Sequence, residues 1–243
     1  MDENVRVACL CPVYGRTRLL QNALACFRAQ DYNGPKRLFV LDDSKLLDHF
    51  NGPDLAVSPF VTRFQSLPAK YNWLLRMATK WGADIALVWE DDDIYLPWHI
   101  SSYVECMNGQ WAHPNKVWSL YTGQLELESA AGRFHASLGF DMGFIKSVGE
   151  WPLTQRADFD QQLLYRLTAA SQPNRPDDHR VPSYVYRWGS THADHGSGRM
   201  KGPEDTQWYD NTPIAESPLR GPLTENMDDE TVRTYQHFQV AKS

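Results

Sequence analysis

Three apolar segments, each followed at once by polar residues, constrain the fold of this chain more than any other feature. They are VRVACLC at 5–11, RLFVL at 37–41 and ADIALVW at 83–89. Apolar residues recur at helical spacing in three further segments, which end near Gln30, Gly82 and Met107. The first follows strand 5–11, the second precedes strand 83–89, and the third follows it. Short apolar strands that alternate with helices predict an α/β fold with a mostly parallel central sheet and helices on its faces.

Polar clusters follow all three predicted strands. They are Pro12-Val13-Tyr14-Gly15-Arg16, Asp42-Asp43-Ser44 and Glu90-Asp91-Asp92-Asp93. In a parallel sheet the carboxyl ends of the strands meet at one edge, and ligands of such folds bind beyond that edge. The sequence therefore predicts one ligand site built from three loops.

The acidic run at 90–93 is the most informative of these clusters. Four adjacent carboxylates repel one another and need a cation or solvent, and hard oxygen ligands suit Mg²⁺ or Mn²⁺. A solvated acidic turn is the alternative explanation. Here an apolar strand precedes the run and Tyr95-Leu96-Pro97 follows it directly, so the run is anchored at the sheet. This context favours a divalent metal site.

The second half of the chain is less regular. Strands are predicted at 116–121, 123–128 and 184–188, and a helix at 157–169. Beyond residue 190 the composition is typical of loop and a weakly ordered tail. We therefore expect one domain with a ligand-binding half at 1–110, a second half at 111–200 that completes the site, and a C-terminal tail at 201–243.

Composition excludes some classes of protein. The 243 residues carry a formal net charge of −6, which argues against a general nucleic-acid binder but leaves a local basic groove open. The four cysteines show no CxxC pair and are expected to be reduced thiols. Neither a secretory signal nor an apolar membrane span is recognisable. We expect a cytoplasmic protein, or one of the host cytoplasm if viral, without integral membrane association.

Four motifs, in order, resemble those of family 2 glycosyltransferases with the GT-A fold. They are CPVYGRTRLLQNALACFRAQDY at 11–32, VLDDS at 40–44, PAKYNWLL at 68–75 and EDDDIYLP at 90–97, the last matching a DxD-type metal motif. The resemblance implies a Rossmann-like sheet with a C-terminal acceptor or lid region. It also implies a nucleoside-diphosphate sugar donor and a divalent metal, Mn²⁺ or Mg²⁺.

Carried over position by position, the resemblance implies roles for the first half. Nucleotide-binding residues would be Pro12, Val13, Tyr14, Arg16, Asp42, Asp43, Lys70, Asn72, Glu90 and Asp91. Glu90 stands where the family has the first Asp of the motif, and Asp92 stands at the second. Asp92 is thus the expected direct metal ligand, with Asp91 and Asp93 as alternatives. Without the motif order, we would interpret Tyr14 as ordinary packing, Lys70 as a solvated helix residue and Asn72 as a partner of local backbone groups.

In the second half, ADFD at 157–160 resembles the motif that supplies the base in inverting members. Asp158 would remove the acceptor proton, with Asp160 as runner-up, although helix capping alone also explains an Asp there. Asp141 and Trp188 would contact the acceptor or donor sugar. His192 would reach the metal, with His195 as alternative; a zinc site or an ordinary loop remains open for this segment.

These features predict transfer of a sugar, with a UDP-linked donor favoured, to a hydroxyl acceptor with inversion. The acceptor would be a glycan, a lipid-linked glycan or a small molecule. One alternative is transfer to a hydroxylated base, such as a hydroxymethyl-pyrimidine, in viral DNA. Another is a non-catalytic sugar-nucleotide-binding domain. A nucleotidyltransferase is disfavoured because no Gly-rich loop with Arg or Lys follows the first strand.

Overall fold

The structure is a computed structural model that describes residues 4–154, 158–188, 223 and 225–240. Its larger sheet has seven strands in the order β3 (Phe50–Asn51), β4 (Leu55–Pro59), β2 (Lys36–Asp42), β1 (Val7–Val13), β5 (Ile85–Val88), β10 (Gly139–Asp141) and β7 (Trp111–Ala112). Its smaller sheet has four, in the order β6 (Ile94–Tyr95), β11 (Tyr184–Trp188), β8 (Lys116–Tyr121) and β9 (Gln124–Ser129).

The larger sheet is mostly parallel, which confirms the predicted fold class. Strand β1 pairs in parallel with β2 on one side and β5 on the other, and β4 continues the parallel pairing beyond β2. Strands β3 and β10 run antiparallel to their neighbours β4 and β5. All seven residues of β1 are buried, because a central parallel strand is covered on both faces. Its unbroken apolar sequence follows from this position.

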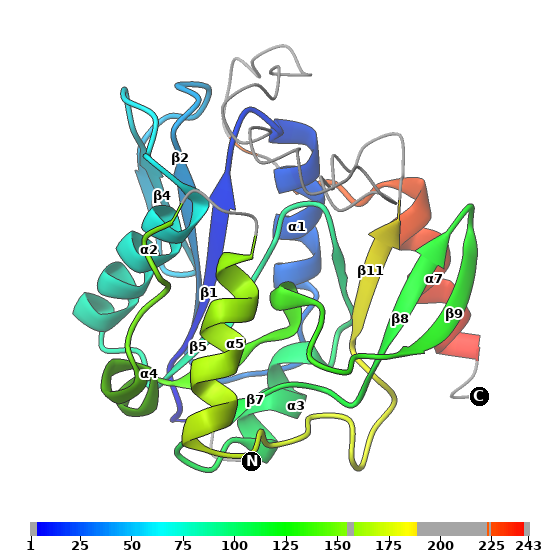
Figure 1. The fold of residues 1–243 in the computed structure, drawn as a ribbon. Helices are drawn as coiled ribbons and strands as arrows, with labels where there is room; N and C mark the ends of the chain where they lie inside the picture. Colours follow the sequence, from blue (N-terminus) through cyan, green and yellow to red (C-terminus); the bar gives the residue numbers. More distant parts are fainter. Residues whose placement is uncertain (1–3, 155–157, 189–222, 224, 241–243) are drawn as a thin grey trace.

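Helices cover both faces of this sheet. They are α1 (Thr17–Arg28), α2 (Leu67–Trp81), α3 (His99–Cys106), α4 (Met142–Val148) and α5 (Phe159–Ala170), with a 3₁₀ turn η1 (His135–Ser137) before β10. Figure 1 shows α2, α4 and α5 on one side of the sheet and α1 on the other. The sequence predicts that α2 begins at Pro68 and ends at Gly82, and the observed ends agree closely because local caps define them. Ser66 Oγ accepts a hydrogen bond from the Ala69 N–H at 3.4 Å, and Gly82 ends the helix at φ 81°.

The smaller sheet brings the second half of the chain against the acidic run. Strand β6 follows that run directly, and β11 returns antiparallel beside it, with Tyr184 opposite Tyr95. Strand β11 also pairs in parallel with β8. The residues of β11 after Val185 therefore lie next to the acidic run, although about 90 residues of chain separate them.

Three segments differ from the sequence prediction. The stretch 46–66, where Gly52, Pro53 and Pro59 predict an irregular chain, contains β4, which extends the parallel sheet. The family resemblance implies an acceptor-facing loop at 139–144, but this segment is strand β10 and the start of α4. The predicted C-terminal tail at 201–243 contains helix α7 (Asp229–Val240). The amphipathic sequence of α7 buries Tyr235 and Phe238 against the core. None of the described helices is both long and apolar enough to cross a membrane.

Candidate functional site

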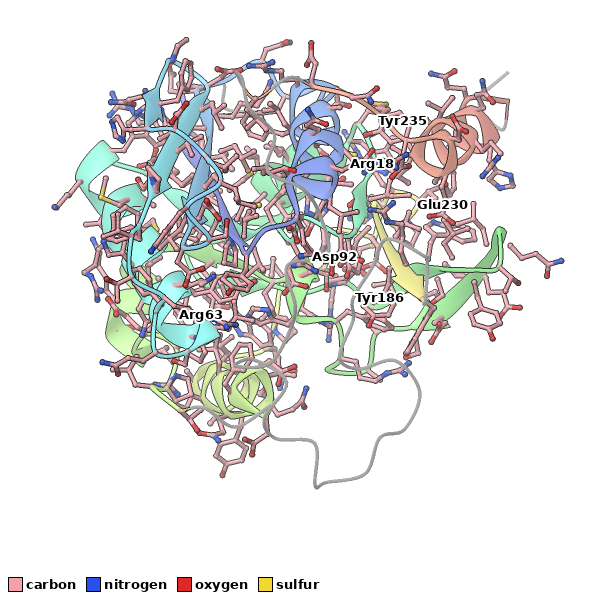
Figure 2. All side chains as sticks on the ribbon, turned by 90° about the horizontal axis from the view of Figure 1, so that it is seen from above. Arg18, Arg63, Asp92, Tyr186, Glu230 and Tyr235 are labelled. Atoms are coloured by element: carbon pink, nitrogen blue, oxygen red, sulfur yellow. The ribbon has the colours of Figure 1, made fainter. Side chains whose placement is uncertain are left out.

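The carboxyl ends of β1, β2 and β5 bring the three predicted loops together at one edge of the large sheet. Arg16, just after β1, donates from Nη2 to Asp91 Oδ1 at 2.5 Å and from Nη1 to Asp92 Oδ2 at 2.7 Å. Figure 2 looks onto this edge and shows Asp92 near the middle, between Arg63 on one side and Tyr186 on the other. The loops after β1 and β5 are therefore in direct contact at this edge.

The acidic run contains a group of carboxylates with metal-binding geometry. Oxygen atoms of Glu90, Asp92 and Asp93 all lie within 4.8 Å of one another. Ligands that bind one hard cation at about 2.0–2.6 Å lie no more than about 5 Å apart, so these three side chains fit a shared Mg²⁺ or Mn²⁺. The buried Asp91 Oδ2 accepts a hydrogen bond from none of the described residues, which leaves a further acceptor unsatisfied here.

Charge at the run is only partly balanced. Burial raises the pKa of Asp91 to about 7; Arg16 opposes this rise, while Asp92 and Glu90 add to it. Arg16 alone cannot neutralise four adjacent carboxylates, and the nearby guanidinium of Arg187 is paired with Asp228, so the site keeps a negative potential. A divalent cation would relieve this repulsion, and the residues present fit such an ion.

Glu90 is held by a network that the sequence did not reveal. Its Oε1 accepts a hydrogen bond from Tyr71 Oη at 3.0 Å and lies 3.2 Å from His135 Nδ1. Trp151 Nε1–H, which can only donate, lies 2.7 Å from His135 Nε2. In a neutral imidazole the proton must therefore be on Nδ1, and it points at Glu90. The carboxylate is thus oriented by two donors from α2 and η1.

Asp93 is held from the other sheet. Tyr184 Oη, in β11, donates to Asp93 Oδ2 at 2.5 Å, and the Arg187 backbone N–H donates to Asp93 Oδ1 at 3.2 Å. Both oxygens of this buried carboxylate thus have donors from β11. The acidic run is therefore held by residues of the β1–α1 loop, α2, η1 and β11.

The predicted nucleotide side forms an adjoining cluster around Tyr14. Lys70, 2% exposed, donates from Nζ to the Val13 carbonyl at 2.9 Å and pairs with Asp43 Oδ1. Burial lowers the pKa of Lys70, and Asp43 counteracts that decrease. The guanidinium carbon of Arg63 lies 4.0 Å from the centre of the Tyr14 ring, and Lys70 Nζ lies 5.4 Å from it. Arg63 was missed because the sequence around it is irregular.

Two predicted nucleotide-binding residues are occupied by backbone contacts. The carboxylate of Asp42 accepts hydrogen bonds from Ser44 N and Oγ and from the N–H groups of the next turn, Leu46 and Leu47. The amide of Asn72 exchanges two hydrogen bonds with the backbone of Trp151, at 2.8 and 2.9 Å. Both side chains shape loops that border the site. Pro12 is part of β1, paired with Leu41 of β2.

The start of α5 abuts the Glu90 network. The ring of Phe159 lies 5.4 Å from the ring of His135, whose Nδ1 meets Glu90. The neighbouring Asp158 is half-buried, and its Oδ1 accepts a hydrogen bond from Gln162 Nε2 at 3.1 Å. Asp160 Oδ1 accepts from the N–H of Gln161 at 2.8 Å. Asp158 and Asp160 thus both flank a residue whose ring packs against His135, the partner of Glu90.

The other predicted sugar-contact residues are placed differently. Asp141 pairs with Ile85 at the start of β5, because β10 is antiparallel, and so lies at the sheet edge opposite the acidic run. Its carboxylate caps α4 by accepting from the N–H groups of Gly143 and Phe144, both at 2.9 Å. Trp188 ends β11, and its Nε1 donates to Ser119 Oγ at 2.9 Å. His192 and His195 lie outside the described residues.

Comparison with known proteins identifies the fold. No protein-family model matches the chain, and no curated protein sequence matches it. Among solved structures it is similar to S. aureus TarS 1–349, a glycosyltransferase of GT-A-like fold. The complex of TarS with UDP-GlcNAc has 16% identity and a TM-score of 0.58, and the match covers 83% of this chain and 63% of TarS 1–349. The UDP complex has 14% identity and a TM-score of 0.56, with coverages of 75% and 60%.

The chain thus spans less than two thirds of the length of the TarS structures it matches. Identity at this level shows the fold alone. The chain has a glycosyltransferase fold, which confirms that part of the resemblance seen in the sequence. Membership of family 2 stays a prediction.

Proposed function

We propose that this protein transfers a sugar from a nucleoside-diphosphate sugar to a hydroxyl group of an acceptor. The observation that carries the proposal is the acidic cluster of Glu90, Asp92 and Asp93 at the carboxyl edge of a parallel sheet, next to the cluster around Tyr14. The fold shared with TarS, which has been solved with UDP and with UDP-GlcNAc, supports a UDP-linked donor.

On the donor side, the ring of Tyr14 is the base-stacking surface, and Pro12 and Val13 complete that wall. Arg63 and Lys70 supply positive charge beside the ring. Asp43, held by Lys70 and by the Phe64 N–H at 2.8 Å, forms the polar floor of this pocket. The cluster thus offers an aromatic face and cations to a nucleotide.

On the phosphate side, Asp92 would hold the metal together with Glu90 and Asp93, and Asp91 remains the alternative ligand. When bound, Mg²⁺ or Mn²⁺ would neutralise charge on the leaving diphosphate. Arg16, half-buried between β1 and α1, orients Asp91 and Asp92 and presents a second cation near the same phosphates.

On the acceptor side, Asp158 is the base that removes the hydroxyl proton, and Gln162 orients its carboxylate. Direct attack of that hydroxyl oxygen on the anomeric carbon breaks the bond to the diphosphate and inverts the configuration. Asp160, in the first turn of α5, is the runner-up.

The acceptor site lies along α5. An open hollow beside Asp158 is lined by Pro152, Gln161, Gln162, Tyr165 and Arg166. Tyr165, 77% exposed, offers an aromatic face to a sugar ring, and the two amides offer hydrogen bonds to hydroxyl groups. Arg166 donates to the Glu150 carbonyl, and Asp158 and Asp160 add negative charge. This chemistry favours a neutral glycan or small polyol over the phosphate backbone of DNA.

The proposal is tested by nucleotide release from a panel of UDP-sugars with Mn²⁺, with and without hydroxyl acceptors. We expect release that depends on acceptor and metal in the parent chain, and its loss in Asp92→Ala. Asp31→Ala is the matched control, because Asp31 is exposed beyond the far end of α1. Tight UDP binding without turnover on any donor and acceptor would support the non-catalytic alternative and contradict this function.

A further inference from the structure

A buried arginine lies directly behind the metal-binding turn. The side chain of Arg187, in β11, is 1% exposed. Its side-chain Nε donates to the backbone carbonyl of Asp92 at 2.6 Å, and its backbone N–H donates to Asp93 Oδ1 at 3.2 Å. One residue therefore contacts two successive members of the acidic run, one through the backbone and one through the carboxylate.

The guanidinium of Arg187 is held in turn by the C-terminal segment. Its Nη1 donates to Asp228 Oδ2 at 2.7 Å, and Glu230 Oε2 lies further away, at 3.6 Å. Asp228 is itself fixed: its Oδ1 accepts from the Thr231 N–H at 2.8 Å, and its N–H donates to Asn22 Oδ1 at 3.1 Å. Asp228 thus joins the start of α7 to both α1 and β11.

Helix α7 reaches the acidic run by a second route. Tyr235 Oη donates to the Tyr95 carbonyl at 2.6 Å, and the hydroxyl of Tyr95 accepts from the Glu90 N–H at 2.7 Å. The ends of the acidic run are thus tied to the same helix, although that helix follows the run by more than 130 residues. Figure 2 shows Glu230 and Tyr235, both of α7, on the same side of Asp92 as Tyr186 of β11.

The planar fork of arginine is needed for this arrangement. Nε and Nη1 serve two acceptors in fixed directions, which the single ammonium of lysine cannot reproduce. Removal of one partner from a buried ion pair leaves an uncompensated charge that the surroundings must move to accommodate. Movement of Arg187 would displace the Asp92 carbonyl and the Asp93 carboxylate together, because both are bound to it.

We propose that Arg187 and Asp228 are positioning residues for Asp92 and Asp93, so that the C-terminal helix sets the affinity of the acidic run for a divalent cation. The inference rests on the proposed function only in taking that run as the metal site. It adds that α7 completes the catalytic edge. This helix lies outside the four motifs, which all belong to the first half of the chain.

The test measures Mn²⁺ binding directly, from the electron paramagnetic resonance signal of free Mn²⁺, with neither donor nor acceptor present. Asp228→Asn keeps the shape of the side chain and removes its charge. We expect its Mn²⁺ affinity to fall by about 10-fold or more, as for other residues that orient metal ligands. Asp228→Glu retains the charge and should recover most of the affinity. Arg187→Lys should resemble Asp228→Asn.

Glu105→Gln is the matched control, because it breaks an exposed ion pair between Glu105 and Arg180 with a 2.6 Å contact. Thermal melts and near-ultraviolet circular dichroism identify variants that are folded at the assay temperature. If folded Asp228→Asn binds Mn²⁺ as tightly as the parent, only this inference is overturned, because a purely structural ion pair would lower the melting temperature alone. A folded parent chain that binds no Mn²⁺ would overturn both this inference and the metal part of the proposed function.

Discussion

Arg16 binds Asp92 through a charged hydrogen bond of 2.7 Å between Nη1 and Oδ2, and the same guanidinium reaches Asp91. The pair joins the loop after β1 to the loop after β5, so it connects the two halves of the donor site. It also places a positive charge next to a proposed metal ligand, which has a measurable consequence.

We predict that Arg16→Gln binds Mn²⁺ more tightly and UDP more weakly than the parent chain. A positive charge about 4 Å from a cation site costs on the order of a few kcal/mol at an effective dielectric constant near 20, more than the hydrogen bonds contribute. Removal of the charge therefore favours the metal, whereas the diphosphate loses a cation. Mn²⁺ titration and calorimetry with UDP measure the two affinities.

Arg76→Gln is the control for this substitution, because Arg76 is exposed on α2 and makes only a 3.4 Å contact with Glu150. A decrease in Mn²⁺ affinity in Arg16→Gln, or an unchanged UDP affinity, would contradict the assigned role of Arg16.

We predict that His135→Phe destabilises the protein and weakens Mn²⁺ binding. Trp151 Nε1 loses its acceptor, and one unsatisfied buried donor costs about 1–3 kcal/mol. Glu90 also loses one of its two orienting donors, so affinity for Mn²⁺ should fall about 10-fold. Urea unfolding and Mn²⁺ titration measure the two effects. The exposed His179, changed to Phe, should leave both quantities unchanged.

We predict that Asp158→Asn loses transfer while it retains the donor. General-base catalysis contributes about 10²–10⁴-fold to rate, and the amide cannot accept the hydroxyl proton. The value of kcat should fall within that range, with little change in the affinity for UDP. Asp160→Asn alters only a hydrogen bond from the Gln161 N–H and should keep kcat within a few-fold. The reverse order of the two effects would reassign the base to Asp160.

We predict that Tyr165→Ala raises the KM for a glycan acceptor and leaves UDP affinity unchanged. The residue lies seven positions beyond Asp158 on α5, two turns or about 10 Å along the helix, which suits a ring adjacent to the reacting one. Tyr165→Phe retains the aromatic face and should retain the KM. Unchanged steady-state kinetics in Tyr165→Ala would remove the hollow from the acceptor site.

The sequence alone determined the parallel core and the location of the acidic run. Central parallel strands are buried on both faces, so β1 and β5 read as unbroken apolar segments, and the polar residues after them mark the carboxyl edge. Local caps placed α2 almost to the residue, since Ser66 and Gly82 act within one turn of the helix ends. These features depend on residues that are close together in the chain, so the sequence pattern predicts them.

Tertiary structure decided which of the polar residues serve the site. Asp141 carries the same type of side chain as Asp158, but the antiparallel direction of β10 moves it to the opposite edge. The side-chain amide of Asn72 is hydrogen-bonded to the backbone of Trp151, 79 residues away. His135 and Arg187 meet the acidic run only because η1 and β11 pack beside it. Such contacts join segments far apart in the chain, and burial patterns along the sequence contain no information on which segments meet.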